Sequence, residues 1–327
     1  MRQTATVLFL TDAAQDYGAD FLYDGFRTLC ADGKVGEVVD WPSKRSLHAG
    51  EQRDFDCDLG WPASSMDLTE ENLPRFCRER EATIIIPTLR GEMPSRLVHW
   101  ASWLRTIADR IVCCDFEDQA MQVLAPMFES CLGFRPAVHF KREVSSISLP
   151  LDIRVLPFGY PARRAVPAVE QREPLVIYDV HVWPWARGGL RERLGELLRE
   201  RFRERADVRL HYSEATRCAP SKYHARMRCA RVAVVPAGLG WFTNRLFEAV
   251  ADGCAVVAEA PRVAFPDGLV DGVECLYFHS EIEGCDHVER LLNDAPFAQR
   301  LAEAGRQALL NRHTTAHRAQ RVMDALT

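Results

Sequence analysis

Short apolar runs alternate with amphipathic stretches through the first half of the chain. The apolar runs are rich in β-branched residues, which is typical of buried strands, and the stretches between them carry apolar side chains at helical spacing. The predicted strands cover residues 6–10, 35–40, 82–87, 110–114 and 137–140, and the predicted helices cover residues 19–29, 70–80, 95–108 and 119–129. Apolar strands that alternate with helices indicate a parallel sheet covered on both faces.

The same alternation restarts after a proline-rich segment, which predicts a linker at about residues 156–173. Beyond it, strands are predicted at residues 175–180, 208–211, 232–235, 255–258 and 274–278, and helices at 189–204, 221–228 and from about 286 and 296 onward. We therefore expect an α/β protein with two Rossmann-like, doubly wound parallel sheets facing each other across a cleft. The expected domains are residues 1–160 and 161–312, followed by a final helix at 313–327.

Composition narrows the class of protein. A chain of 327 residues that is 47% hydrophobic and 27% charged is long enough for two globular cores, and no apolar run is long enough to span a bilayer. The net charge of −5 does not favour a nucleic-acid partner, although a local basic groove stays possible. Asp12 and Asp16 closely follow the first apolar run, so a signal peptide is not expected. The 11 cysteines contain no Cys-x-x-Cys pair, which indicates reduced thiols and a cytoplasmic location.

The segment Gly238-Leu-Gly-Trp-Phe-Thr-Asn-Arg-Leu-Phe-Glu248 has the most specific pattern in the chain. A glycine-containing loop leads from a predicted strand into a helix, whose free N–H groups and dipole favour an anion. Arg245 and Glu248 are three residues apart on one helix face, so Arg245 can meet a phosphate and Glu248 can accept hydrogen bonds from ribose hydroxyls. The alternative is a plain strand–helix–strand unit in which the two side chains pair with each other.

The stretch Thr243-Asn-Arg-Leu-Phe-Glu-Ala-Val-Ala-Asp-Gly-Cys-Ala-Val-Val257 resembles the donor-site signature of GT-B glycosyltransferases, and most closely that of the spore-maturation (CgeB-like) branch. Further similar segments are Phe140-Lys-Arg-Glu143, Leu156-Pro-Phe-Gly159, Ala304-Gly-Arg306 and His313-Thr-Thr-Ala-His-Arg318. The chain departs from the better-known retaining members at Gly240, where they carry a second glutamate. Donor chemistry that depends on the paired glutamates is therefore not carried over.

This resemblance implies a cytoplasmic, metal-independent glycosyltransferase that needs no cofactor and takes a nucleoside-diphosphate sugar as donor. Glu248 would bind the ribose, and Arg245 would bind the diphosphate. The residues expected to assist at the diphosphate are Gly238, Gly240, Thr243 and Asn244 of the loop, with Lys141 and Arg142 as further cations. The final helix would return to the first domain. The sugar, the acceptor (a surface glycan, a protein or a modified nucleobase), the stereochemical outcome and the oligomeric state stay open.

Several of these residues have a simpler structural explanation. Lys141 and Arg142 follow a predicted strand, where a charged pair usually marks a solvated strand end. Asp16 lies in the loop after the first strand and is our candidate for the general base, with Asp12 and Asp20 as alternatives. Aspartates at such positions also cap helices.

Two other groups of residues, tryptophans and histidines, have spacings that fit ligand binding or packing. Trp183, Trp185 and Trp241 are placed to stack on a nucleobase or to pack between elements. His313 and His317 have the spacing of a zinc pair, but no third ligand can be named, so we expect no metal site.

Two other functions remain open from the sequence. The same two-domain plan would serve a sugar-nucleotide epimerase or hydrolase, which needs no large acceptor. The missing glutamate at Gly240 also leaves room for a non-catalytic subunit that binds a glycan or a partner protein.

Overall fold

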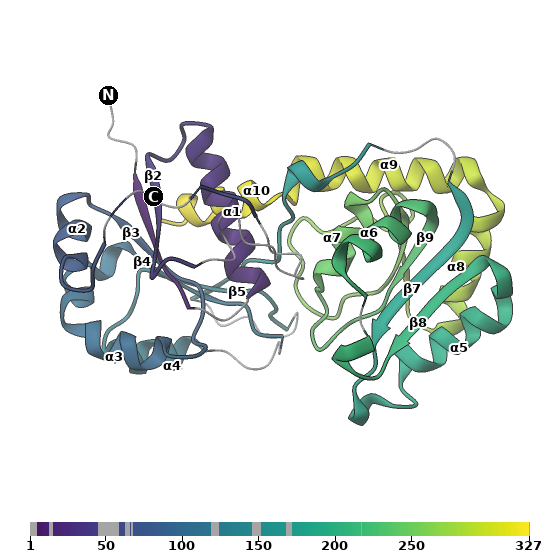
Figure 1. Ribbon diagram of the computed structural model, residues 1–327, viewed down its shortest axis with the longest axis horizontal. Coiled ribbons are helices and arrows are strands. Elements are labelled where there is room, and N and C mark those ends of the chain that lie inside the picture. Colours follow the sequence, from purple (N-terminus) through teal and green to yellow (C-terminus); the bar gives the residue numbers. More distant parts are fainter. Residues whose placement is uncertain are drawn as a thin grey trace. The chain divides into compact units, whose positions relative to one another are not determined.

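The computed structural model describes residues 5–12, 16–44, 59–62, 66, 68–118, 124–145, 152–167, 172–216 and 218–326. The chain forms two compact units (Figure 1). The N-terminal unit comprises Met1–Pro161, Val263–Pro266 and Thr314–Thr327, and the C-terminal unit comprises Ala162–Arg262 and Asp267–His313. Within the described residues, no helix combines the length and apolar character that crossing a membrane requires.

The N-terminal unit is built on a parallel sheet in the order β2-β1-β3-β4-β5-β6. Its strands are β1 (Thr6–Leu10), β2 (Glu37–Trp41), β3 (Thr83–Ile86), β4 (Ile111–Asp115), β5 (Val138–Lys141) and β6 (Ile153–Val155). Its helices are α1 (Tyr17–Ala31), α2 (Leu73–Glu79), α3 (Met93–Leu104), α4 (Ala125–Leu132) and α10 (Thr315–Asp324). Of the helix predicted at 119–129, residues 119–123 lie outside the described residues.

The two faces of this sheet are covered by different helices, as the alternation of side chains along a strand requires. Leu8 and Leu10 of β1 join the apolar cluster formed with α2, α3 and α4. Phe9 points to the other face, where its ring packs edge-on against Tyr23 and Phe26 of α1 with centroids 5.3 and 5.4 Å apart. Every residue of β1 is buried, and all of them after Thr6 are apolar.

The last helix, α10, packs against α1 in the N-terminal unit. The Thr315 hydroxyl donates to Oδ2 of the fully buried Asp24 at 2.6 Å. Arg318 donates through Nε to the carbonyl oxygens of Pro157 and Phe158 at 2.9 and 3.0 Å. The segment expected to begin the linker is therefore part of this unit, since Leu156, Phe158 and Tyr160 are all buried.

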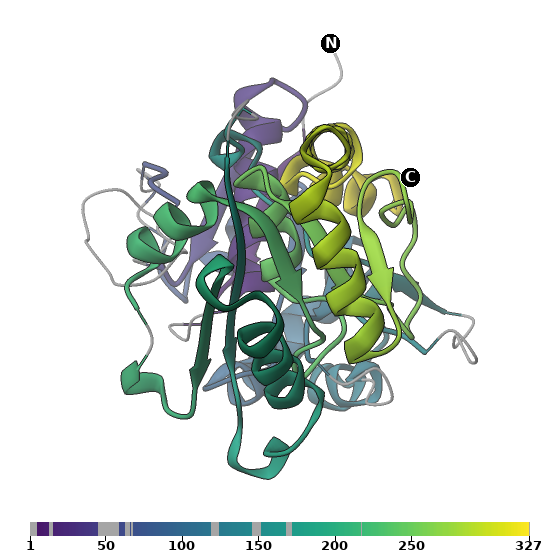
Figure 2. The same cartoon turned by 90° about the vertical axis from the view of Figure 1, so that its right-hand side faces the viewer.

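The C-terminal unit contains a second parallel sheet in the order β11-β10-β9-β7-β8 (Figure 2). Its strands are β7 (Glu173–His181), β8 (Ala206–His211), β9 (Ala230–Val235), β10 (Ala255–Glu259) and β11 (Leu276–Phe278). Its helices are α5 (Leu190–Phe202), α6 (Pro220–Cys229), α7 (Asn244–Ala251), α8 (Glu281–Asn293) and α9 (Ala295–Arg312). Helices α5 and α8 share one apolar cluster with the strands, and α6 and α7 contact β9 as well.

The predicted α/β class with two doubly wound parallel sheets is confirmed. In both units the second strand along the chain lies outside the first, and the third lies on the first strand's other side. The direction of winding therefore reverses between β1 and β3 and again between β7 and β9. In open α/β sheets, ligands bind beyond the carboxyl ends of the strands at such a reversal. The cleft between the two sheets stays a prediction.

Candidate functional site

The predicted loop and helix lie at the reversal point of the C-terminal sheet. Strand β9 ends at Val235, and the chain then forms a loop before α7 begins at Asn244. Neighbouring β7 ends at His181, and the two strands are hydrogen-bonded partners. The sequence pattern thus coincides with the position at which this topology places a ligand.

The N-terminus of α7 is not closed by its own cap. The N-cap residue Thr243 makes no side-chain hydrogen bond to the first turn. At Gly238 a Cβ atom would lie 2.7 Å from Cγ2 of Thr243 and 3.1 Å from Nη2 of Arg191, so the close approach of the loop depends on glycine. Oδ1 of Asn244 is buried and has no hydrogen-bond partner. An uncapped helix start behind a tight glycine loop is suited to an anionic group.

Arg245 and Glu248 lie on this helix, and Glu248 is buried with 7% of its surface exposed. Nε of Arg245 donates to the Tyr223 hydroxyl at 3.2 Å, and its guanidinium lies 5.8 Å from the centre of the Tyr223 ring. Burial lowers the pKa of Arg245, but Tyr223, Glu248 and Asp179 together outweigh burial and raise the pKa. Arg245 therefore carries its charge beside the open helix start.

A second arginine, Arg191, reaches the same loop and was not predicted. Its Nε donates to the carbonyl oxygen of Ala237 at 2.6 Å, and its Nη1 donates to that of His181 at 2.7 Å. Burial, together with the charge of Arg245, lowers the pKa of Arg191 to about 10. One feature of the sequence could have pointed to Arg191. It is in the first turn of α5, where the helix dipole disfavours a cation.

The tryptophans surround this region in the C-terminal unit. The Trp183 ring lies 4.8 Å from the Arg191 guanidinium and stacks on Trp185 with centroids 6.1 Å apart. Trp185 is 74% exposed, so part of its surface is accessible for stacking. Trp241 instead lies beneath Arg262, whose guanidinium is 5.3 Å from the ring centre.

In the N-terminal unit, Asp16 is the N-cap of α1. Its Oδ1 accepts hydrogen bonds from the amides of Gly18 at 3.0 Å and Ala19 at 3.1 Å. Its other oxygen, Oδ2, lies 3.9 Å from Nε of Arg90. The helix-capping explanation thus holds for Asp16, and its role as general base stays a prediction.

Lys141 and Arg142 are buried in ion pairs of the N-terminal unit rather than at a solvated strand end. The Lys141 side chain is 0% exposed, and its Nζ lies 3.0 Å from Oδ2 of Asp115. Nη2 of Arg142 pairs with Asp118 and lies 3.1 Å from Glu143, and its guanidinium is 4.4 Å from the Phe158 ring centre. These contacts give both cations structural partners, and their role at the diphosphate stays a prediction.

No metal centre emerges from the part of the chain that the structure describes, because no three His, Cys, Asp or Glu side chains are grouped to bind an ion. His313 is fully buried with its ring centre 5.0 Å from that of Phe247. Nδ1 of His317 lies 2.6 Å from the Thr314 hydroxyl at the start of α10. His313 therefore packs within the C-terminal unit, and His317 lies in the first turn of α10.

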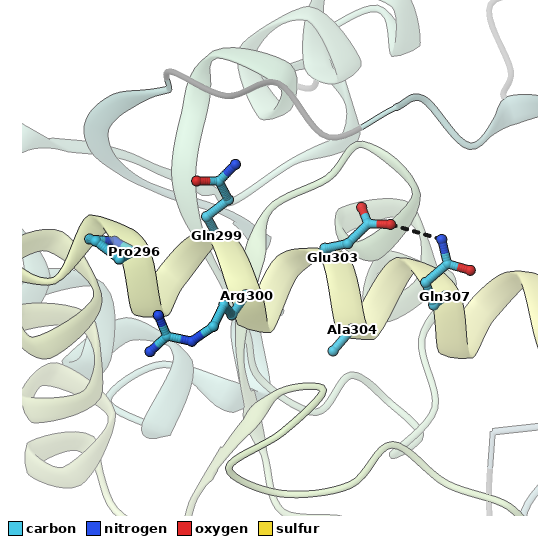
Figure 3. Close-up of a pocket in the computed structure, with 6 residues that line it drawn as sticks. All are labelled: Pro296, Gln299, Arg300, Glu303, Ala304 and Gln307. Carbon is cyan, nitrogen blue, oxygen red and sulfur yellow. Dashed lines mark hydrogen bonds between the residues drawn. The ribbon is translucent and has the colours of Figure 1, made fainter.

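A hollow of about 590 Å³ lies elsewhere in the C-terminal unit, along α9 (Figure 3). It is lined by Pro296, Gln299, Arg300, Glu303, Ala304 and Gln307, all from this one helix. Glu303 accepts hydrogen bonds from Gln307 at 2.8 Å and from Arg306 at 2.9 Å. This hollow contains none of the predicted site residues.

The fold is that of GT-B glycosyltransferases. Residues 191–324 match a family described as glycosyl transferase-like, a range that includes the whole of α7. The expected GT-B fold is thus confirmed, and the family match supports the expected glycosyltransferase class. No curated protein matches the sequence.

Three solved structures illustrate the similarity. Anabaena Alr3699/HepE in complex with UDP-glucose has a TM-score of 0.58 and 11% identity, with 98% of this chain and 99% of that chain covered. An α-glucosyltransferase in complex with UDP and a 13-mer DNA has a TM-score of 0.60 and 11% identity, with 99% of each chain covered. A candidate UDP-N-acetylglucosamine 2-epimerase from Listeria monocytogenes has a TM-score of 0.55 and 11% identity, with 99% of this chain and 96% of that chain covered.

Proposed function

We propose that this protein transfers a sugar from a nucleoside-diphosphate sugar to an acceptor hydroxyl without a metal ion. The observation that carries the proposal is the uncapped start of α7, where Gly238, Arg245 and Glu248 surround the reversal point of the C-terminal sheet. The family match over residues 191–324 supports the same reaction class. Of the three similar structures described above, two contain UDP or UDP-glucose, so uridine nucleotides are the first donors to test.

In the proposed reaction, the bond between the sugar's anomeric carbon and the terminal phosphate oxygen breaks. Its electron pair remains on that oxygen, and the nucleoside diphosphate leaves with the added negative charge. The acceptor oxygen forms the new bond to the anomeric carbon and loses its proton to a base. Fixed N–H groups at the start of α7 and the guanidinium of Arg245 would stabilise the leaving phosphate.

The remaining predicted roles belong to the same proposal. Glu248 would accept hydrogen bonds from the ribose hydroxyls, and Asn244 offers a buried oxygen without a protein partner for a further ligand donor. Asp16 would take the acceptor proton on Oδ2, because Oδ1 already serves the helix cap. The acceptor itself, the CgeB-like branch and the cytoplasmic location stay predictions.

The proposal is tested first at Glu248. Thermal-shift and calorimetric titrations with UDP, ADP, GDP and dTDP identify the nucleotide that the protein binds, because a bound ligand raises apparent stability. Glu248→Ala should then weaken binding of that nucleotide by about 10- to 100-fold, since a hydrogen bond to a charged group contributes roughly 1.5–3 kcal/mol. Glu303→Ala, on the solvent side of α9, is the matched control and should bind normally. A folded Glu248→Ala protein with unchanged affinity for each nucleotide would contradict the assignment.

A sugar-nucleotide epimerase is the second candidate, because a candidate epimerase from Listeria monocytogenes has the same fold. An epimerase changes the donor sugar without any acceptor, whereas a transferase releases the nucleoside diphosphate much faster when the acceptor is present. Incubation of the donor with and without candidate acceptors therefore separates the two activities. A protein that binds the nucleotide and performs neither reaction would fit the non-catalytic alternative.

A further inference from the structure

Arg191 occupies a position in the C-terminal unit that its protein contacts alone do not explain. Its guanidinium joins the carbonyl oxygen of His181, at the end of β7, to that of Ala237, just beyond β9. It therefore bridges the two strands between which the winding of the sheet reverses. These hydrogen bonds use Nε and Nη1, whereas Nη2 lies beside Gly238, 3.1 Å from where a Cβ would stand.

The charge of Arg191 is not neutralised by an ion pair among the described side chains. The carboxylate that acts on its pKa is that of Glu259, whose Oε2 already accepts the Ala237 amide at 2.9 Å. The other charged neighbour that acts on Arg191 is Arg245, a like charge. Two cations held together in a partly buried site, one of them without a counter-ion, are costly unless an anion binds between them.

The two arginines differ in their position relative to Glu248. Glu248 and Arg245 share α7, and Glu248 acts on the pKa of Arg245. Arg191 reaches from α5 to Gly238 of the loop that precedes the helix, whereas Glu248 lies more than one turn into the helix. If Glu248 binds the ribose, the first phosphate falls near Arg245, and the second phosphate falls nearer Arg191.

We propose that Arg191 binds the terminal phosphate of the donor's diphosphate through its Nη2, while its other two nitrogens hold the ends of β7 and β9 in place. This inference rests on the proposed function, because it needs a nucleotide at α7. It assigns to Arg191 the charge that develops on the leaving oxygen. Arg245 would then neutralise mainly the phosphate next to the ribose.

The experiment compares a nucleoside diphosphate with its monophosphate, using the nucleotide that binds best among UDP, ADP, GDP and dTDP. Arg191→Gln should reduce diphosphate affinity by about 10- to 100-fold, since a charge-assisted hydrogen bond is lost, and should change monophosphate affinity by less than about threefold. Arg193→Gln is the matched control. Arg193 is on the same helix but is exposed and paired with Glu281, so both affinities should remain unchanged.

Arg191→Lys provides the second variant. It retains the positive charge but cannot bond two carbonyls and a phosphate at once, so its preference for diphosphate over monophosphate should fall by an intermediate factor. This variant decides the question if Arg191→Gln does not fold. An unchanged preference in either folded variant overturns the inference. An equal loss of monophosphate and diphosphate affinity also overturns it, because this shows that Arg191 only shapes the loop.

The outcomes separate this inference from the proposed function. If the unmodified protein binds none of the four diphosphates, both are wrong. If it binds one of them and Glu248→Ala loses that binding while Arg191→Gln retains it, only the role of Arg191 is wrong.

Discussion

The two carboxylate oxygens of Asp16 have different surroundings, which allows capping and catalysis to be separated. Asparagine caps a helix about as well as aspartate but cannot take a proton from an acceptor hydroxyl. Asp16→Asn should therefore keep the cap of α1 and change stability by less than about 0.5 kcal/mol, while transfer falls by roughly 10²- to 10⁴-fold. Steady-state transfer rates and thermal midpoints measure the two effects.

Asp12→Asn is the matched comparison, because Asp12 lies in the same loop and is an alternative base. Loss of transfer in Asp12→Asn with full activity in Asp16→Asn would move the catalytic role to Asp12. Full activity in both variants would remove the base from this loop.

Asp20 gives a prediction about pH and stability. Burial raises the pKa of Asp20 from 3.8 to about 6, against the opposing charge of Lys44, whose Nζ lies 2.5 Å away. Because the folded-state pKa is raised, the stability that Asp20 contributes is fully present below about pH 4 and is lost as the pH rises through 6. Relative to Asp20→Asn, the unmodified protein should lose roughly 1–3 kcal/mol of unfolding free energy over this interval.

Urea unfolding midpoints at several pH values between 4 and 7 test this expectation. Glu79→Gln serves as control, since Glu79 is an exposed partner of Arg75 on α2 and should leave the pH profile of stability unchanged. Parallel profiles for Asp20→Asn and the unmodified protein would show that Asp20 does not titrate as the buried contacts imply.

Contacts of single residues could be predicted only where the two partners are close together in the sequence. Arg245 and Glu248 were predicted because three positions on one helix fix their common face. Arg191 was not, because its partner Ala237 is 46 positions away and only the closed sheet brings the two together. The ion-pair partners of Lys141 and Arg142 were missed for the same reason, since Asp115 and Asp118 lie on another strand and the loop after it.

The contact between α1 and α10 depends on a glycine at its centre. A Cβ at Gly25 would overlap the backbone carbonyl of Thr315, so the two helices approach closely only with glycine there. Gly25→Ala gains about 1 kcal/mol in helix propensity but forces the helices apart, which typically costs 1–3 kcal/mol. We expect net destabilisation, seen as a lower thermal midpoint.

Gly195→Ala is the matched control in α5. There the new Cβ would meet the end of the Leu210 side chain at 2.8 Å, and a side chain can move where a backbone carbonyl cannot. The thermal midpoint should therefore fall less in Gly195→Ala than in Gly25→Ala. Equal midpoints, or a rise in Gly25→Ala, would show that α10 is not held by this close approach.

Among the elements, the apolar strands were predicted best, because burial on both faces leaves an uninterrupted apolar run. Strand β6 (Ile153–Val155) was missed because it is short, and none of its three residues is fully buried. A helix after His313 was expected from sequence, but its position on α1 depends on Gly25, Asp24 and Thr315, which belong to distant parts of the chain.

The first five strands of each sheet have the same order, which explains why two parallel sheets could be predicted without any recognised repeat. Each unit needs only alternating strands and helices, and right-handed crossovers then leave few possible topologies. The reversal between β7 and β9 strengthens the weak glycine pattern as a candidate site, because it places the loop after Val235 beside the end of β7. The sequence alone predicted the loop, but not that the end of β7 lies beside it.

Transfer should survive removal of divalent metals. Arg245 and Arg191 bring positive charge to the α7 site in the C-terminal unit, and protein groups rather than an ion hold both side chains in position. Fixed cations and N–H groups can stabilise a leaving phosphate directly. Activity measured in excess EDTA should therefore remain within about twofold of activity with added Mg²⁺ or Mn²⁺, a small difference compared with the several kcal/mol that a catalytic metal supplies.

The EDTA experiment requires two further measurements, because a metal can act on the substrate rather than on the protein. Nucleotide affinity should be measured in EDTA alongside transfer, and Arg245→Gln should be tested in both conditions. If Arg245 supplies the stabilising charge, the variant loses activity with or without Mg²⁺. Complete loss of transfer in EDTA that Mg²⁺ restores, in the unmodified protein, would show that a metal ion and not the arginine pair stabilises the leaving group.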